Sequence, residues 1–169
     1  MFSTRRSIRK YKDLQIEKEK IDTIIENTLF SPTSKNRRPW EFIIVQDREN
    51  IEAISKVREM GSSFLNGAPC VMLVIGDPNA SEIWIEDTSI AAYAIQLAAH
   101  EQGLGTCWVQ IRLREHSGDL TASEYLKEKF GIPGHMEVAC AIGIGYPDEE
   151  KAPHELTNEL HAKVHHERY

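Results

Sequence analysis

Side chains that bind anions are concentrated at the start of the chain. The segment Arg5-Arg6-Ser7-Ile8-Arg9 places three guanidinium groups and one hydroxyl group within five residues. Guanidinium groups form planar, charge-assisted, bidentate hydrogen bonds with phosphate oxygens. If the segment is helical, Arg5 and Arg9 share one face, because they are four residues apart. The spacing alone also fits a solvated basic terminus, so both interpretations stay open.

A second group of polar side chains lies in the loop between Ser31 and Trp40. The loop carries hydroxyl groups, an amide and three cations between two prolines. Such a composition is typical of a plain turn, and it also suits a donor-rich cradle for a polar ligand. Its residues are Pro32, Thr33, Ser34, Lys35, Asn36, Arg37, Arg38 and Pro39.

The charge is distributed unevenly along the chain. Residues 1–40 hold 10 Lys/Arg and 5 Asp/Glu, a balance of +5, whereas residues 41–169 hold 10 and 21, a balance of −11. This distribution predicts a local anion site at the start of an acidic body. Nucleic-acid binding generally needs a basic domain, and the overall pI near 5.7 argues against it.

The composition and the cysteines narrow the class of protein. At 169 residues the chain fits one domain, 1–169, which is large enough to bury a core. The first residues contain no apolar run, so we expect neither a signal peptide nor a membrane anchor. Cys70, Cys107 and Cys140 are odd in number and lack CxxC spacing, which predicts reduced core thiols in a cytoplasmic protein.

The tail from Pro153 to Tyr169 is polar and rich in histidine. His161 and His165 are four residues apart, a spacing that can hold a metal ion on a helix face. No carboxylate or cysteine obviously completes such a site, so we predict no metal. A polar arm that docks on another subunit is the interpretation we favour for the tail.

The elements that must position these side chains are organised around the stretch from Asn79 to Gln110. Asn79 and Glu82 predict a capping pair at a helix start, and Gly103 predicts a left-handed stop. The helix between them has about 23 residues and spans roughly 34 Å. From Ile90 onward it is apolar almost all round, which predicts a buried helix, either in the chain's own core or shared with a partner subunit.

Shorter periodic segments predict the rest of the fold. Apolar spacing indicates helices at 17–30, 48–60 and 122–130, strands at 41–47 and 68–77, and a further strand after Gly103, with 68–77 central and fully covered. The strand expected at 138–146 alternates strictly, with Val138, Cys140, Ile142 and Ile144 on one face and Ala139, Ala141, Gly143 and Gly145 on the other. The small-residue face suits a packed helix, a planar ligand or a partner chain.

In order and spacing, these segments resemble the FMN-dependent nitroreductases over nearly the whole chain. The matching motifs are Arg5-Arg6-Ser7-Ile8-Arg9, Ser31-Pro32-Thr33-Ser34 with Asn36 and Pro39-Trp40-Glu41-Phe42, Asp87 with the helix ending in Gly103-Leu104-Gly105-Thr106-Cys107-Trp108, Gly131-Ile132-Pro133, and Gly143-Ile144-Gly145-Tyr146-Pro147. The resemblance implies an α+β fold, a three-layer α/β sandwich of the nitroreductase type, and an obligate homodimer with exchanged terminal segments. It also implies two FMN sites at the subunit interface, each built from both chains.

The resemblance also implies which residues bind FMN. It assigns Arg5, Arg6, Ser7 and Arg9 of one subunit, and Pro32, Thr33, Ser34 and Asn36 of the other. A flavin phosphate needs cations, and we expect Arg9 to place a positive charge near the N1–C2 edge of the ring. Lys151 is the only cation available where family members often have a basic pair after Tyr146. We expect the backbone at Val109 and Gln110 to lie near flavin N5.

The implied activity is an oxidoreductase that passes hydride from NADH or NADPH through FMN to small acceptors, such as nitroaromatics or quinones, in two steps. Because hydride transfer depends on stacking distance and orientation, we expect no catalytic side chain. Two alternatives stay open: an FMN enzyme of the same fold that runs dehalogenation, flavin breakdown or heterocycle oxidation, and a non-catalytic flavin-binding module. We expect neither nucleic acid nor a membrane as a partner.

Overall fold

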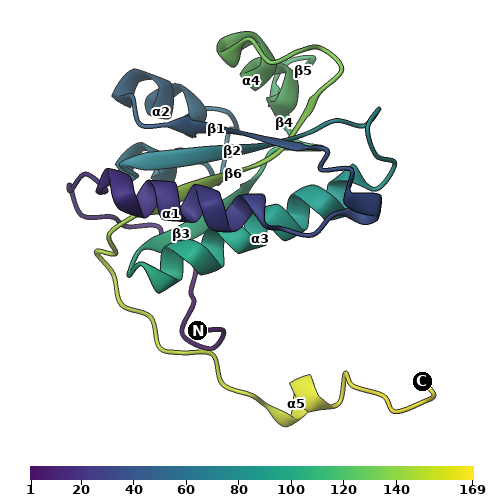
Figure 1. Ribbon diagram of the computed structural model, residues 1–169. Helices are drawn as coiled ribbons and strands as arrows, with labels where there is room; N and C mark the ends of the chain where they lie inside the picture. Colours follow the sequence, from purple (N-terminus) through teal and green to yellow (C-terminus); the bar gives the residue numbers. More distant parts are fainter.

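A four-stranded antiparallel sheet forms the middle layer of the protein, whose computed structural model describes residues 1–169 (Figure 1). The strand order is β1-β2-β6-β3, so β2 and β6 are interior strands. Every residue of β2 is buried, which confirms the prediction of a central, fully covered strand. The strands are β1 (Trp40–Val45), β2 (Cys70–Gly76), β3 (Gly105–Gln110) and β6 (Glu137–Gly145).

Helices cover both faces of the sheet and complete the three-layer α+β arrangement expected from the resemblance (Figure 1). α1 (Lys18–Leu29) and α3 (Trp84–Glu101) lie on one face, where Ile24 and Ile95 belong to the same buried apolar cluster as Met72 of β2. α2 (Arg48–Ser55) and α4 (Ala122–Phe130) lie on the other face. The remaining elements are the hairpin of β4 (Glu115–Ser117) and β5 (Leu120–Thr121), and the single turn α5 (Asn158–His161).

The first residues of the chain run along the outer edge of β3 and are extended rather than helical. Ser7 forms a parallel bridge with Thr106, and the Ile8 N–H donates to the Thr106 carbonyl at 2.9 Å. Further on, the Lys12 N–H donates to the Tyr146 carbonyl at 2.9 Å. Arg5 and Arg9 therefore do not share a helix face, and their placement depends on the sheet edge instead.

α3 begins later than its sequence predicts. Asn79 does not cap it, because Asn79 lies in a preceding turn where its N–H donates to Asp77 Oδ1 at 2.8 Å. The helix starts at Trp84 and has 18 residues. Its predicted stop is confirmed, since Gly103 has a φ of 77°.

α2 is also shorter than the predicted 48–60 helix and ends at Ser55. The buried Ser62 hydroxyl donates to the Ser55 carbonyl at 2.8 Å, which satisfies a carbonyl at the helix end. Gly61, with a φ of 87°, turns the chain back toward the sheet. None of the helices combines the length and the apolar composition that crossing a bilayer demands.

The strict alternation predicted for β6 is wrong at its beginning. The register between β2 and β6 shifts so that Val74 pairs with Cys140 and Ile75 pairs with Val138, which leaves Ala139 as a bulge. Val138 consequently packs in the α2–α4 core, on the opposite face from Cys140.

The small-residue face of β6 is covered by the chain itself. A methyl group at Gly143 would lie 2.7 Å from Leu65 Cδ2, and one at Gly145 would lie 2.6 Å from Pro69 Cδ. Tyr11 also approaches both glycines. These close contacts leave no space for a planar ligand or a partner chain, so those two interpretations of this face are wrong.

We expect Gly105→Ala to destabilise the fold, because the new methyl group would lie 2.8 Å from Ile8 Cβ. Ile8 is buried and hydrogen-bonded through its backbone, so the N-terminal segment must shift from the edge of β3. Overpacking of this kind costs about 1–3 kcal/mol, measurable as a lower midpoint in urea denaturation. Gly134→Ala is the matched control, since nothing lies within 4 Å of its added methyl group. An equal midpoint for the two variants would contradict the prediction.

Candidate functional site

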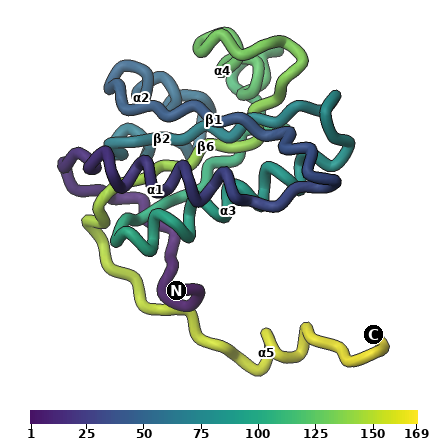
Figure 2. Tube along the Cα trace, viewed as in Figure 1, coloured from purple at the N-terminus to yellow at the C-terminus, as the bar shows by residue number.

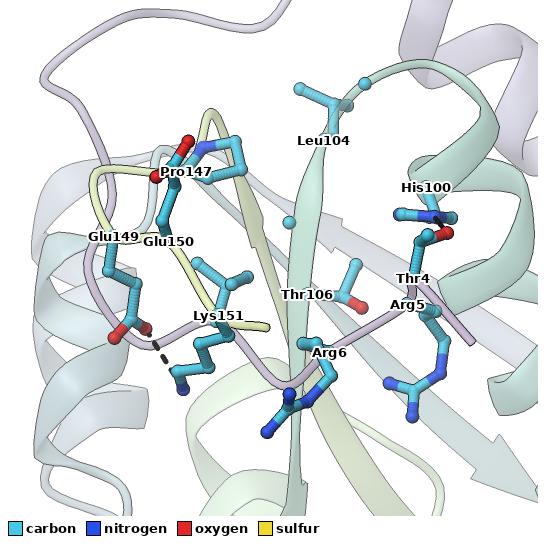
Figure 3. Close-up of a pocket in the computed structure, with 13 residues that line it drawn as sticks. Thr4, Arg5, Arg6, His100, Leu104, Thr106, Pro147, Glu149, Glu150 and Lys151 are labelled. Carbon is cyan, nitrogen blue, oxygen red and sulfur yellow. Dashed lines mark hydrogen bonds and ion pairs between the residues drawn. The ribbon is translucent and has the colours of Figure 1, made fainter. Parts of the chain in front are cut away.

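Cationic side chains from both ends of the chain meet in one polar cavity of about 260 Å³. No apolar residue lines this cavity, which we call the anion pocket. Figure 3 shows the charged ends of Arg5, Arg6 and Lys151 pointing to the same side of an adjoining cavity of about 250 Å³. The residues that line the anion pocket are Arg5, Arg6, Ser7, Arg9, Lys151 and His154.

Hydrogen bonds between the N-terminal segment and residues 147–152 hold the anion pocket together. Lys151 Nζ donates to the Ser7 carbonyl, and Arg6 Nη1 donates to the Ala152 carbonyl. The Asp148 N–H donates to the Lys10 carbonyl at 2.9 Å. The structure thus brings together all five cations and hydroxyls that the sequence analysis selected from these two regions, although they are more than 140 residues apart along the chain.

One donor in the anion pocket is buried and has no partner. Three buried side-chain polar atoms lack a hydrogen bond: Arg5 Nε, Ser31 Oγ and Trp40 Nε1. Because buried polar groups are almost always paired, an orphan donor in a cationic pocket indicates a site for an anion. The other two orphan atoms flank the loop Pro32–Pro39, so all three belong to the two segments with predicted ligand chemistry.

The loop after α1 has an unusual backbone. Lys35, Asn36 and Arg38 have φ values of 51°, 55° and 48°, in the left-handed region that non-glycine residues rarely adopt. The Arg38 N–H donates to Thr33 Oγ1 at 3.0 Å, and the Ser34 N–H donates to Asp87 Oδ1 at 3.0 Å. Strained backbone held by specific hydrogen bonds favours the cradle over the plain turn. Pro32 and Asn36 are exposed, and Thr33 and Ser34 are half-buried.

The N-terminal segment, which lines the anion pocket, and the loop lie near opposite ends of α3 (Figure 2). Ser34 is bound to Asp87 in the first turn, whereas Thr4 Oγ1 lies 2.9 Å from His100 Nε2 in the last turn. About 13 residues separate these two anchors, which is roughly 20 Å of helix. One chain therefore does not bring the two groups into a single site.

Val109 and Gln110 have their side chains engaged within the chain. Val109 is in the α2–α4 core. The Gln110 side chain accepts from Trp108 Nε1 and donates to the Arg112 carbonyl, each at 3.0 Å. Since β3 is an edge strand, only backbone groups on its outer side are available to a ligand. The expected contact between this backbone and a flavin stays a prediction.

Sequence reasoning missed two residues, His154, which lines the anion pocket, and Glu149, which lines the adjoining cavity. Glu149 Oε1 accepts from the Arg9 and Lys10 N–H groups, the latter at 3.3 Å, and lies 3.4 Å from Lys151 Nζ. The hydrogen bond from the Arg9 N–H is the main reason that the pKa of Glu149 is lowered. Their closeness to Lys151 in the sequence could have identified them, because both residues lie within three positions of it.

The cysteines and tail histidines lie outside this site. Cys70, Cys107 and Cys140 are free and buried, as predicted. Burial raises the pKa of the Cys70 thiol to about 12, which keeps it protonated and unreactive. No group of three or more His, Cys, Asp or Glu side chains is arranged to hold a metal ion.

The fold matches known proteins over nearly its full length. The model of the Nitroreductase family matches residues 2–60 and 56–146. Among solved structures, an FMN-dependent nitroreductase from Clostridium difficile R20291 superimposes with a TM-score of 0.97 and 44% sequence identity. The match covers 99% of this chain and 98% of that protein.

Two archaeal relatives agree with this match. The protein of Archaeoglobus fulgidus provisionally named NADH dehydrogenase/NAD(P)H nitroreductase is 34% identical over 174 residues, which cover 100% of this chain and 97% of the relative. A protein of the same name from Methanothermobacter thermautotrophicus is 36% identical over 156 residues, 90% of this chain and 78% of the relative. With the family model spanning most of the chain, these similarities show that the protein belongs to the nitroreductase family.

Proposed function

We propose that this protein is an FMN-dependent oxidoreductase that uses NADH or NADPH to reduce small acceptors, such as nitroaromatics or quinones, in two half-reactions. The observation that carries the proposal is the anion pocket with its buried, unpaired Arg5 Nε. The FMN dependence in the name of the Clostridium difficile structure and the NAD(P)H in the names of the archaeal relatives support it.

The donor set of the anion pocket fits the phosphate end of FMN. Arg5, Ser7 and Lys151 offer charged or hydroxyl donors that suit a phosphate dianion. At about 260 Å³ the pocket is smaller than the roughly 300–1,000 Å³ typical of sites for whole ligands, so it holds the phosphate rather than the ring. When bound, FMN supplies the hydride chemistry, and the protein supplies binding, orientation and charge.

A second copy of the chain completes the site in this proposal. Ile83, immediately before α3, and Ile90 and Tyr93 on α3 are 38–44% exposed and form an apolar stripe that begins at the start of the helix. Two copies of α3 packed antiparallel about a two-fold axis would bury both stripes. The same rotation would bring the Pro32–Asn36 loop of each copy to the anion pocket of the other, since these groups lie at opposite ends of α3.

The C-terminal arm supports the same assembly. Residues 152–169 are exposed and extend away from the three layers (Figure 1). Leu156, Leu160 and Val164 are 79%, 46% and 62% exposed, an apolar repeat that one chain leaves uncovered. Exchange of these arms between copies would bury them. We also propose a cytoplasmic location, in keeping with three free, buried cysteines.

The chain's own residues orient the reactants rather than transfer protons. Arg9 lines the anion pocket and lies 5.9 Å from the centre of the Phe64 ring, so its charge is held at one edge of the site. We propose that this charge stabilises the N1–C2 edge of the reduced flavin. Stacking geometry then sets the rate of hydride transfer, and no side chain needs to act as acid or base.

A visible spectrum tests the proposed function directly. We expect the purified protein to be yellow with FMN bound, and to bleach when NADH or NADPH is added without oxygen. A nitroaromatic or quinone should then restore the colour. Colourless protein that takes up no added FMN would refute the proposal. Bound FMN that NAD(P)H does not bleach would instead favour a flavin-binding module.

A further inference from the structure

A carboxylate lies beside Lys151, one of the cations that would hold the phosphate, and lines the cavity that adjoins the anion pocket. Glu149 accepts hydrogen bonds from two backbone N–H groups, those of Arg9 and Lys10, and lies 3.4 Å from Lys151 Nζ. Figure 3 shows the Glu149 carboxylate facing the Lys151 ammonium group. Such a position, between a lysine and the N–H groups of an arginine-rich segment, is one that a bound anion would also favour.

The Glu149 carboxylate is ionised, and water screens its charge only in part. The Glu149 and Lys151 side chains are 20% and 25% exposed, so water weakens their attraction less than it does for a surface pair. Hydrogen bonds from the Arg9 and Lys10 N–H groups lower the pKa of Glu149, and the pair with Lys151 lowers it further. The carboxylate therefore stays charged throughout the neutral pH range in which a flavin would bind.

We propose that Glu149 is an affinity-determining counter-ion of Lys151: it competes with the phosphate for the ammonium group that Lys151 offers to the anion pocket, and it keeps FMN weakly held and exchangeable. This inference rests on the proposed function. Lys151 is the only lysine in the pocket, and its ammonium group is already shared between Glu149 and the Ser7 carbonyl. A phosphate must therefore draw Lys151 away from Glu149 or bind beside an uncompensated negative charge.

Glu149 also has a structural role, because its carboxylate joins two segments of the chain. An isosteric substitution separates this structural role from the electrostatic one. The bonds from the Lys12 N–H to the Tyr146 carbonyl and from the Asp148 N–H to the Lys10 carbonyl hold the two segments together independently of Glu149. In Glu149→Gln the amide oxygen can still accept from the Arg9 N–H. The substitution thus removes the charge and keeps the shape of the segment.

Equilibrium titration of the flavin-free protein, followed by quenching of flavin fluorescence, tests the inference. We expect Glu149→Gln to lower the Kd for FMN about threefold to tenfold, as for the removal of one partly screened charge. The Kd for riboflavin, which lacks the phosphate, should not change. Glu155→Gln, which removes the same charge from an exposed side chain on the arm, should leave both Kd values unchanged.

A second comparison tests the role of Lys151. In a Lys151→Met background, Glu149→Gln should improve FMN binding less than it does in the native chain, because the released ammonium group is gone. An unchanged or higher Kd for FMN in Glu149→Gln would overturn the inference, and parallel weakening of FMN and riboflavin would make Glu149 purely structural. Failure of the native protein to bind FMN would refute the proposed function instead, so the two failures are distinguishable.

Discussion

Arg5→Ala combined with Arg9→Ala is expected to lower the affinity for FMN on the order of 100-fold or more. Each arginine supplies a charge-assisted hydrogen bond worth about 1.5–3 kcal/mol, and two such losses together reach 3–6 kcal/mol. Isothermal titration of the flavin-free protein with FMN measures the change. Riboflavin binding should fall less, since Arg5 lines the pocket assigned to the phosphate, which riboflavin lacks, whereas the proposed contact of Arg9 with the ring is common to both ligands.

The same double variant should fold normally, which separates a binding role from a structural one. Arg5 Nε is buried without a partner, so removing it leaves no other group unpaired. The flavin-free variant should therefore match the native protein in its midpoint of thermal unfolding. Lys56→Ala combined with Lys129→Ala is the control. It removes two positive charges from exposed side chains at the ends of α2 and α4, which do not line the anion pocket. If FMN affinity is the same in both double variants, the arginines are merely solvated.

The segments with short-range signals were predictable from the sequence. β2 is a continuous apolar run and is buried along its whole length, and α4 ends at Gly131 in the left-handed conformation, as its glycine and the following proline indicate. The candidate binding residues were equally visible, because cations and hydroxyls in the first 40 residues stand out against an acidic body.

The start of α3, the bulge in β6 and the role of Glu149 were predicted wrongly or missed. In each case the outcome depends on which of several possible partners a residue contacts, and the local sequence does not specify this. Asn79 and Asp77 are both good capping residues, and Asp77 uses its carboxylate to close an earlier turn, so the helix starts at Trp84. The bulge at Ala139 depends on the register with β2, which no pattern within β6 contains. Glu149 was not selected from the sequence, although it precedes Lys151 by two residues. Its contact with the Arg9 N–H joins residues 140 positions apart, and the sequence carries no trace of that pairing.

The exposed stripe on α3 leads to the second large effect. Ile90→Glu combined with Tyr93→Glu is expected to convert a dimer into a 19.3 kDa monomer, because four glutamates would meet where the two stripes pack. Sedimentation equilibrium measures the change in mass. The flavin-free monomer should keep its secondary structure, since both side chains are about 40% exposed in the single chain.

FMN affinity should fall with the dimer, on the order of 100-fold or more, although the substituted side chains do not line the anion pocket. Half of the proposed ligand set belongs to the second copy, so a monomer retains the phosphate contacts and loses those of the loop. Leu14→Glu combined with Met60→Glu adds the same charge at exposed apolar positions off the stripe, and should leave both mass and affinity unchanged. A monomer that binds FMN as tightly as the native protein would show that one chain suffices. In that case the separation of the two groups by α3 would need another explanation, such as a loop that reaches the pocket only after the flavin has bound.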